Sequence, residues 1–151
     1  MRKQVITFRL GEQTYCVPIL SVREVRSMEE PIPVPYSRPY VKGAINLRGV
    51  ITMVIDLAGY FGLKSAAQPK NIIIVEDDSE GSERKRCGLI VDSVVEMPDI
   101  DISALQSVGV RPVGAGDKSA SAHDSLAGMI IIGNDIVGFI NLNTVLKKAF
   151  S

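Results

Sequence analysis

Few residues of this 151-residue chain have types and spacing suited to catalysis. The single histidine, His123, is followed directly by Asp124, and such a pair could act as a base with its orienting carboxylate. Both lie in residues 109–125, a segment rich in Gly, Ser and Ala that indicates a loop without the fixed geometry of a catalytic pair. We expect no catalytic site there. A hydrolase using this pair is a rival hypothesis, which substrate screening with a His123→Ala variant would test.

Other side chains that could bind a metal or a cofactor also lack the spacing of such a site. Cys16 and Cys87 lie in apolar segments without C-x-x-C spacing, so we expect buried, reduced thiols. Asp77 and Asp78 stand among other charges, as in a solvated turn. The sequence contains no glycine-rich phosphate cradle before a helix and no recognised metal-binding spacing. We therefore predict no enzyme activity, no metal and no cofactor.

Composition narrows the classes of partner. The 17 Lys and Arg residues balance 17 Asp and Glu residues, aromatic residues make up 5% of the chain, and there is no Trp. Neutrality with few stacking side chains argues against nucleic acid. A small nucleic-acid-binding barrel is a second rival, which a salt-dependent gel shift would reveal. The longest apolar runs are far shorter than the ~20 residues of a membrane span, so we expect a cytoplasmic protein without direct membrane insertion.

The apolar pattern predicts mainly strands joined by tight turns. Ile6, Phe8 and Leu10 alternate with Thr7 and Arg9, which predicts a half-buried strand and the first arm of a hairpin. A short helix is expected from Pro18 to Val25, because apolar residues recur there at every third position. The C-terminal residues 142–149 have helical spacing.

The segment from Val41 to Leu57 has the densest pattern of the chain. It predicts two strands joined by a tight turn, in which Gly49 takes a positive φ and Arg48 stands at the tip. Asp56 is then expected to cap a short helix. Upstream, Ile32 and Val34 alternate with prolines, which keep the backbone extended. They suit either a protein interface or the rim of the core.

Two parts of the chain resemble each other. The pattern around Gly43 recurs around Gly128 at an offset of 85 residues, and the pattern around Glu24 recurs around Glu96 at an offset of 72. The repeat predicts two small closed barrels packed side by side. Asp56 and Asn141 are equivalent, which favours helix caps over catalysis, whereas Glu24 suits a structural or a binding role.

Arg48 differs from its counterpart in the repeat. The second copy has Gly133 at the same turn tip, so folding does not require an arginine there. Its five rigid donors suit recognition of a partner. A solvated surface arginine is the alternative interpretation.

The chain closely resembles the CheW family of chemotaxis coupling proteins. The resemblance rests on the stretch Gly43-Ala44-Ile45-Asn46-Leu47-Arg48-Gly49, with Asp56-Leu57 downstream and Pro33-Val34-Pro35 upstream, and extends over nearly the whole chain. It implies a mostly β fold of two fused, intertwined five-stranded SH3-like barrels with short helices, forming a single domain over residues 1–151. It also implies a non-enzymatic adaptor.

The family implies two partners and a surface for each. The adaptor couples the cytoplasmic tips of chemoreceptors to the regulatory domain of the histidine kinase CheA in membrane-associated arrays, with other copies of the adaptor as further partners. Positions that match the receptor surface are Val22, Glu24, Gly43 and Arg48. Ile32 and Val34 are assigned to the kinase surface. We also expect a charge-assisted contact between Glu24 and Arg48. The pathway served, in flagellar, pilus or other motility, is left open.

Overall fold

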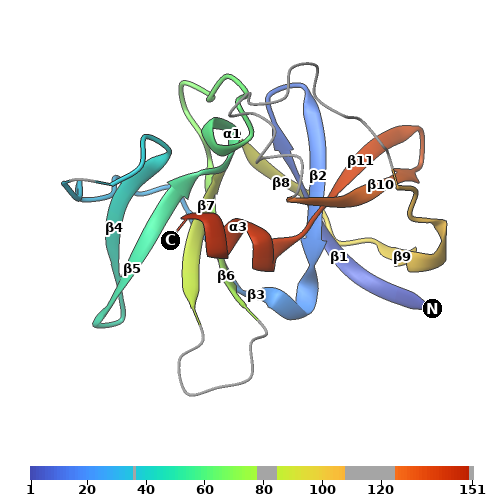
Figure 1. Ribbon diagram of the computed structural model, residues 1–151, viewed down its shortest axis with the longest axis horizontal. Coiled ribbons are helices and arrows are strands. Elements are labelled where there is room, and N and C mark those ends of the chain that lie inside the picture. The colour runs from blue at the N-terminus through green and yellow to red at the C-terminus, as the bar shows by residue number, and fades with distance from the viewer. Residues whose placement is uncertain (36, 78–84, 108–124, 150–151) are drawn as a thin grey trace.

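The computed structural model describes residues 1–35, 37–77, 85–107 and 125–149. Two β-sheets lie side by side, with short helices packed between them (Figure 1). This confirms the predicted mostly β fold class. Asp78, the pair His123 and Asp124, and nearly all of the predicted loop over 109–125 lie outside the described residues.

The first sheet is formed by the middle of the chain. Its strand order is β3-β6-β7-β5-β4, with β3 at Val22–Ser27, β6 at Asn71–Glu76, β7 at Arg86–Val91, β5 at Val50–Asp56 and β4 at Val41–Leu47. β5 and β7 run parallel, and the other neighbours run antiparallel. One face encloses a small apolar core of Ile45, Leu47, Val54, Ile72, Ile74 and Ile90.

The second sheet combines the two ends of the chain. Its order is β10-β11-β2-β1-β8, with β10 at Leu126–Ile132, β11 at Asp135–Ile140, β2 at Gln13–Pro18, β1 at Arg2–Leu10 and β8 at Ser93–Glu96. Short β9 (Asp99–Asp101) also pairs with β1 and adds a sixth strand to the five predicted. The core on its inner face consists of Val5, Cys16, Ile100, Ile130 and Val137.

A single β-bridge links the two edges of each sheet. Ile32, which follows β3, exchanges two backbone hydrogen bonds of 2.9 Å with Ala44 of β4. Gln106, which follows the short 3₁₀ helix Ile102–Ala104, does the same with Met129 of β10 at 2.8 Å. Since these pairs join strands at opposite edges, both sheets close into barrels.

Glycine is required where each bridge forms. A Cβ on Gly43 would lie 2.0 Å from the carbonyl oxygen of Ile32, and a Cβ on Gly128 would lie 2.6 Å from that of Gln106. Both glycines also follow a register shift in their hairpins. The repeat at an offset of 85 therefore has a physical cause, since each barrel closes by bringing a backbone carbonyl against a residue without a side chain.

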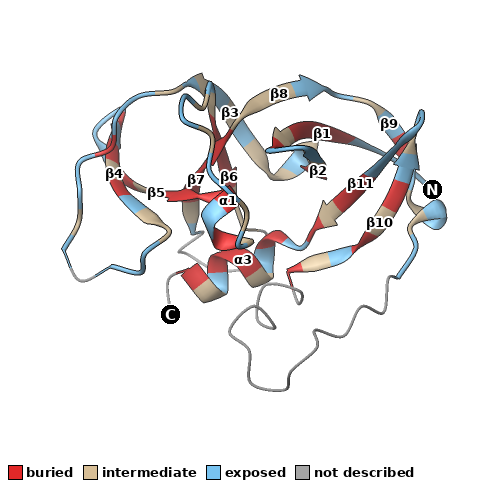
Figure 2. Cartoon of the chain, turned by 90° about the horizontal axis from the view of Figure 1, so that it is seen from above, coloured by how far each residue is buried: buried red, intermediate tan, exposed pale blue. Residues whose placement is uncertain are grey.

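The largest apolar core lies between the two barrels. Helices α1 (Leu57–Tyr60) and α3 (Leu142–Ala149) each contribute buried residues to it, which are red in Figure 2. Tyr15 of the second sheet stacks on Phe61, which follows α1, with ring centroids 5.4 Å apart. This shared core includes Ile6, Phe8, Leu10, Val17, Ile55, Leu57, Ile73, Val75, Leu89, Val91, Ile140, Val145 and Leu146. None of the helices in the described part of the chain is long and apolar enough to span a bilayer.

The predicted helix over residues 18–25 is wrong. A 3₁₀ turn spans Ile19–Ser21, and β3 begins at Val22. The apolar spacing of three fits a helix locally, but β3 pairs with β6 and so satisfies its backbone groups in a ladder.

Two side-chain predictions also require correction. Thr7 is buried, because β1 is covered on both faces, and its hydroxyl bonds the backbone of Glu96. Asp56 makes no side-chain cap to α1 and instead accepts a hydrogen bond from the hydroxyl of Ser65. Asn141 does act as a cap, accepting the N–H of Thr144 at 3.3 Å.

Cys16 and Cys87 are buried and free, as predicted. Burial raises the pKa of both thiols to about 12, so the thiolate form is rare in the folded protein at pH 8. We expect no reaction with a thiol reagent at pH 8, and reaction of both thiols in denaturant. The two buried neutral thiols should contribute fully to the free energy of unfolding below the unfolded thiol pKa of ~8.5. Their contribution should fall as the pH rises above that value, because the unfolded thiols then ionise and the folded ones do not. Fast native labelling would contradict the burial.

Candidate protein-binding site

The site begins with the turn between β4 and β5. Leu47 pairs with Val50, so Arg48 and Gly49 form a two-residue loop. Both have positive φ, 52° and 87°, as in a type I′ turn. The side-chain oxygen of Asn46 accepts the N–H of Gly49 at 2.7 Å and holds the loop in place. The prediction of Gly49 with a positive φ and Arg48 at the tip is confirmed.

The backbone of Arg48 is unusual. Among the described residues, every other positive φ belongs to a glycine. A side chain in this left-handed region is strained, and such strain gathers at functional positions. An arginine is therefore kept where glycine would fold more easily, which favours recognition over the alternative of a solvated surface residue.

Glu24 and Arg48 form the expected contact. Nη2 of Arg48 donates to Oε2 of Glu24 at 3.2 Å. The same carboxylate oxygen lies 3.8 Å from Arg26, which also bonds Glu29 at 3.0 Å. The Arg48 side chain is 78% exposed and that of Glu24 is 23% exposed. The carboxylate therefore orients the guanidinium while most of the arginine's donors face solvent.

Three of the predicted receptor residues share one cavity. Val22, Glu24 and Arg48 line a cavity of about 310 Å³ beside the β4–β5 turn of the first barrel. Barrel closure brings the β4–β5 turn beside β3, and these two elements together form this side of the cavity. The other residues that line the cavity were not predicted from the sequence; they are Leu20, Arg23, Leu47, Glu76 and Arg86.

The other predicted contact residues lie elsewhere. Gly43 is buried at the closing bridge in β4, roughly 17 Å along the chain from Arg48 in the turn that follows this strand. The close approach of the Ile32 backbone explains why this position is a glycine. A receptor contact at Gly43 stays a prediction. Ile32 is 74% exposed beside β4, and Val34 is half-buried. Their kinase role also stays a prediction.

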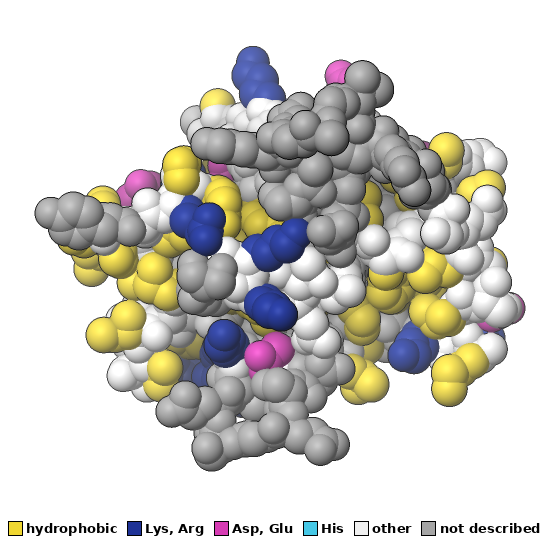
Figure 3. Space-filling view, viewed as in Figure 1, with side chains coloured by type: hydrophobic (Ala, Val, Ile, Leu, Met, Phe, Trp, Pro, Cys, Tyr) yellow, Lys and Arg dark blue, Asp and Glu magenta, His cyan; other side chains and the backbone are white. Residues whose placement is uncertain are grey.

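The surface around these elements mixes charge with apolar side chains. Figure 3 shows basic side chains along the middle of one face and apolar side chains on both sides of them. Ile51 and Ile136, which match in the repeat, are both exposed. Exposed apolar side chains beside charged ones are features that protein interfaces share.

The sequence of the chain matches one protein family over nearly its whole length. The family model described as a CheW-like domain matches residues 4–150. The chain belongs to the CheW-like family. A chemotaxis protein CheW of Rhizobium meliloti is 32% identical over 149 residues, covering 97% of this chain and 88% of that protein. A Rhizobium etli protein named as a probable chemotaxis protein CheW is 38% identical over 105 residues, which cover 69% of this chain and 65% of the relative, slightly less than two thirds.

A solved CheW structure has the same fold. The scaffolding protein TtCheW from Thermoanaerobacter tengcongensis superposes with a TM-score of 0.76 at 30% identity, over 94% of this chain and 86% of that one. The two SH3-like barrels of this CheW-like chain thus have the fold of a CheW scaffolding protein.

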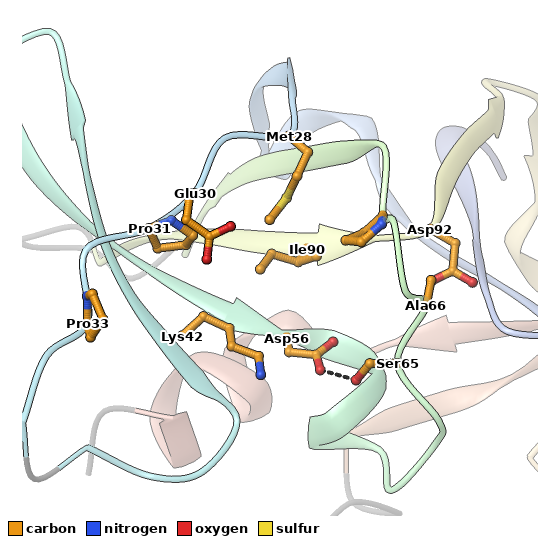
Figure 4. A pocket seen from close by; sticks show the side chains of 11 residues that line it. Met28, Glu30, Pro31, Pro33, Lys42, Asp56, Ser65, Ala66, Ile90 and Asp92 are labelled. Carbon is orange, nitrogen blue, oxygen red and sulfur yellow. Dashed lines mark hydrogen bonds between the residues drawn. The ribbon is translucent and has the colours of Figure 1, made fainter.

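The CheW-like chain also has a second cavity, of about 240 Å³, beside the first barrel. Figure 4 shows the hydroxyl of Ser65 bonded to Asp56, with the Lys42 side chain extending toward them. Asp56 is 6% exposed, so its carboxylate depends on this hydroxyl for a partner. The contact ties the segment after α1 to the end of β5.

Proposed function

We propose that the chain is a non-enzymatic adaptor that couples chemoreceptor tips to the regulatory domain of the histidine kinase CheA. The observation that carries the proposal is the cavity beside the β4–β5 turn of the first barrel. Val22 and Glu24 of β3 line it together with the strained Arg48 of the β4–β5 turn. Because the Arg48 donors are preoriented, a receptor segment loses little freedom in meeting them.

The kinase is assigned to another surface of the same barrel. Ile32 is exposed and its backbone is held both by neighbouring prolines and by the bridge to Ala44. A restrained apolar side chain of this kind is suited to a protein interface. With receptor and kinase on separate surfaces, the adaptor sets their relative geometry, and differential contacts in two signalling states bias kinase activity. The protein acts in the cytoplasm and reaches receptor arrays through its partners.

An Arg48→Glu substitution should weaken receptor capture strongly and leave kinase capture intact. The new carboxylate would face Glu24, whose oxygen now lies 3.2 Å from the guanidinium, so repulsion replaces attraction. We expect affinity for a receptor tip fragment to fall at least about tenfold. Pull-down and calorimetry against this fragment and the kinase regulatory domain provide the measurement.

Arg9→Glu is the matched control, because it makes the same charge change on the second barrel. The Arg9 side chain donates to the carbonyl of Gly11 at 3.3 Å. Combining Glu24→Arg with Arg48→Glu should bind receptor better than either single variant. Equal binding by all three would disprove the pairing. Receptor capture by Arg48→Glu at the level of wild type would refute the proposed receptor site, and an unfolded Arg48→Glu protein would give Arg48 a structural role.

A further inference from the structure

A second carboxylate shared by two arginines lies beside the Arg48 site. Oε2 of Glu76 is 3.5 Å from Nη1 of Arg23, and Oε1 of Glu76 is 3.5 Å from Nη2 of Arg86. The three residues come from neighbouring strands β3, β6 and β7, and all three line the 310 Å³ cavity. Glu76 thus holds one arginine on each side of it.

Arg23 reaches this cavity because β3 has a bulge. The register of β3 on β6 shifts between Val22 and Glu24, which leaves Arg23 as the extra residue. A bulge redirects a side chain that strict alternation would place on the opposite face. The second barrel has the same bulge in β8, where Val95 is the extra residue. The backbone feature is therefore common to both barrels, and the arginine occurs in only one.

The pair of opposite charges formed by Glu76 and Arg86 is also confined to the first barrel. They are direct partners across β6 and β7. The equivalent partners across β1 and β2 of the second barrel are Arg9 and Thr14. Both barrels fold with the same closing bridge and bulge, so this charged set is not a requirement of the fold. Its presence in the barrel that also carries Arg48 indicates a role in binding.

The cavity presents cations to a partner although its charges nearly balance. The arginine side chains are more exposed than the glutamates that hold them: Arg48 is 78% exposed against 23% for Glu24, and Arg23 and Arg86 are 54% and 30% exposed against 12% for Glu76. The carboxylates are used internally, and guanidinium donors are left for a ligand. A carboxylate is the group that such planar donors bind best in a protein partner.

We propose that Arg23 and Arg86, held by Glu76, form a second docking point for an acidic segment of the chemoreceptor tip. This inference rests on the proposed function and deepens it. The segment carries one carboxylate for Arg48, another for the Arg23–Arg86 pair, and an apolar side chain that covers Leu20. Leu20 is 95% exposed and lines both this cavity and its neighbour of about 600 Å³. Burying it would add apolar area to the charged contacts.

The test measures binding of the full chain to a receptor tip fragment by calorimetry. Arg23→Gln and Arg86→Gln should each weaken binding by about tenfold, the typical effect of losing one charge-assisted hydrogen bond. Arg23→Lys should bind with intermediate affinity, because it keeps the charge and loses the planar fork. Affinity of the double Gln variant should also depend less on salt concentration.

The controls separate recognition from folding. Arg9→Gln removes one arginine from the second barrel and should bind the tip fragment like wild type. All variants should bind the kinase regulatory domain normally and unfold at an unchanged urea midpoint. Loss of both partners with a lowered midpoint would assign Arg23 and Arg86 to folding and overturn the proposal.

The Gln variants and Arg48→Glu test different claims, namely the second docking point and the proposed function. If the Gln variants bind the tip fragment like wild type while Arg48→Glu binds it much more weakly, the second docking point is wrong and the proposed function stands. If Arg48→Glu also binds like wild type, the proposed function fails as well. An unchanged salt dependence in the double Gln variant would contradict recognition of a carboxylate.

Discussion

A Phe8→Ala substitution is expected to lower the free energy of unfolding by about 3–5 kcal/mol, the usual cost of removing a buried aromatic ring. Phe8 is fully buried in β1 and belongs to the core between the barrels. The cavity left behind would face apolar side chains of both sheets. Since one core serves both barrels, we expect them to unfold together in a single transition.

Urea unfolding followed by circular dichroism tests this expectation. Phe139→Ala is the matched control, because Phe139 is half-buried beside the separate core of the second barrel. We expect its effect to be less than half as large. Two unfolding transitions, or equal effects of the two substitutions, would show that the barrels are independent and that the central core does not couple them.

A Gly43→Ala substitution should have the second large effect. The added Cβ would lie 2.0 Å from the carbonyl oxygen of Ile32, and the backbone has φ of +142°, a conformation that side chains rarely adopt. Either the Ile32–Ala44 bridge opens or the hairpin shifts. Steric strain of this kind costs roughly 2–4 kcal/mol, and the clash is with backbone, which cannot rotate away.

Gly11→Ala provides the comparison for Gly43→Ala. Gly11 also has positive φ, but nothing lies within 4 Å of a Cβ added there, so it reports backbone strain alone. We expect it to cost about 1 kcal/mol. If Gly43→Ala unfolds at the wild-type urea midpoint but loses receptor capture, Gly43 acts in binding, as the resemblance implied, and the closing bridge does not explain it.

The Arg48 turn shows how much of the site local sequence determines. Arg48 and Gly49 form a two-residue loop that the side chain of Asn46 holds, and its geometry follows from these neighbouring residues, so its tip was predictable. The matching turn of the second barrel has Gly133 in place of an arginine, and this difference identified Arg48 from the sequence alone. Arg23 carried the same signal, since Val95 stands at the matching position, but only the bulge reveals where its side chain points.

Glu76 and Arg86 could not be found this way. Their counterparts, Arg9 and Thr14, lie at the N-terminus, because the second barrel is assembled from both ends of the chain. A search at one constant offset cannot align strands that are ordered differently along the sequence. Only the strand pairing shows that the two hairpins are equivalent.

Local pattern determined the hairpins, the C-terminal helix, the duplicated plan and the tip position of Arg48, because alternation, turn residues and helical spacing act between near neighbours. Tertiary structure decided that Thr7 is buried, that Asp56 bonds Ser65, and that residues 22–25 are strand. Each of these outcomes depends on a partner from another segment of the chain or on a second covered face. The cavity shared by Arg48 and Glu76 is likewise a product of barrel closure, which joins residues that no sequence window contains.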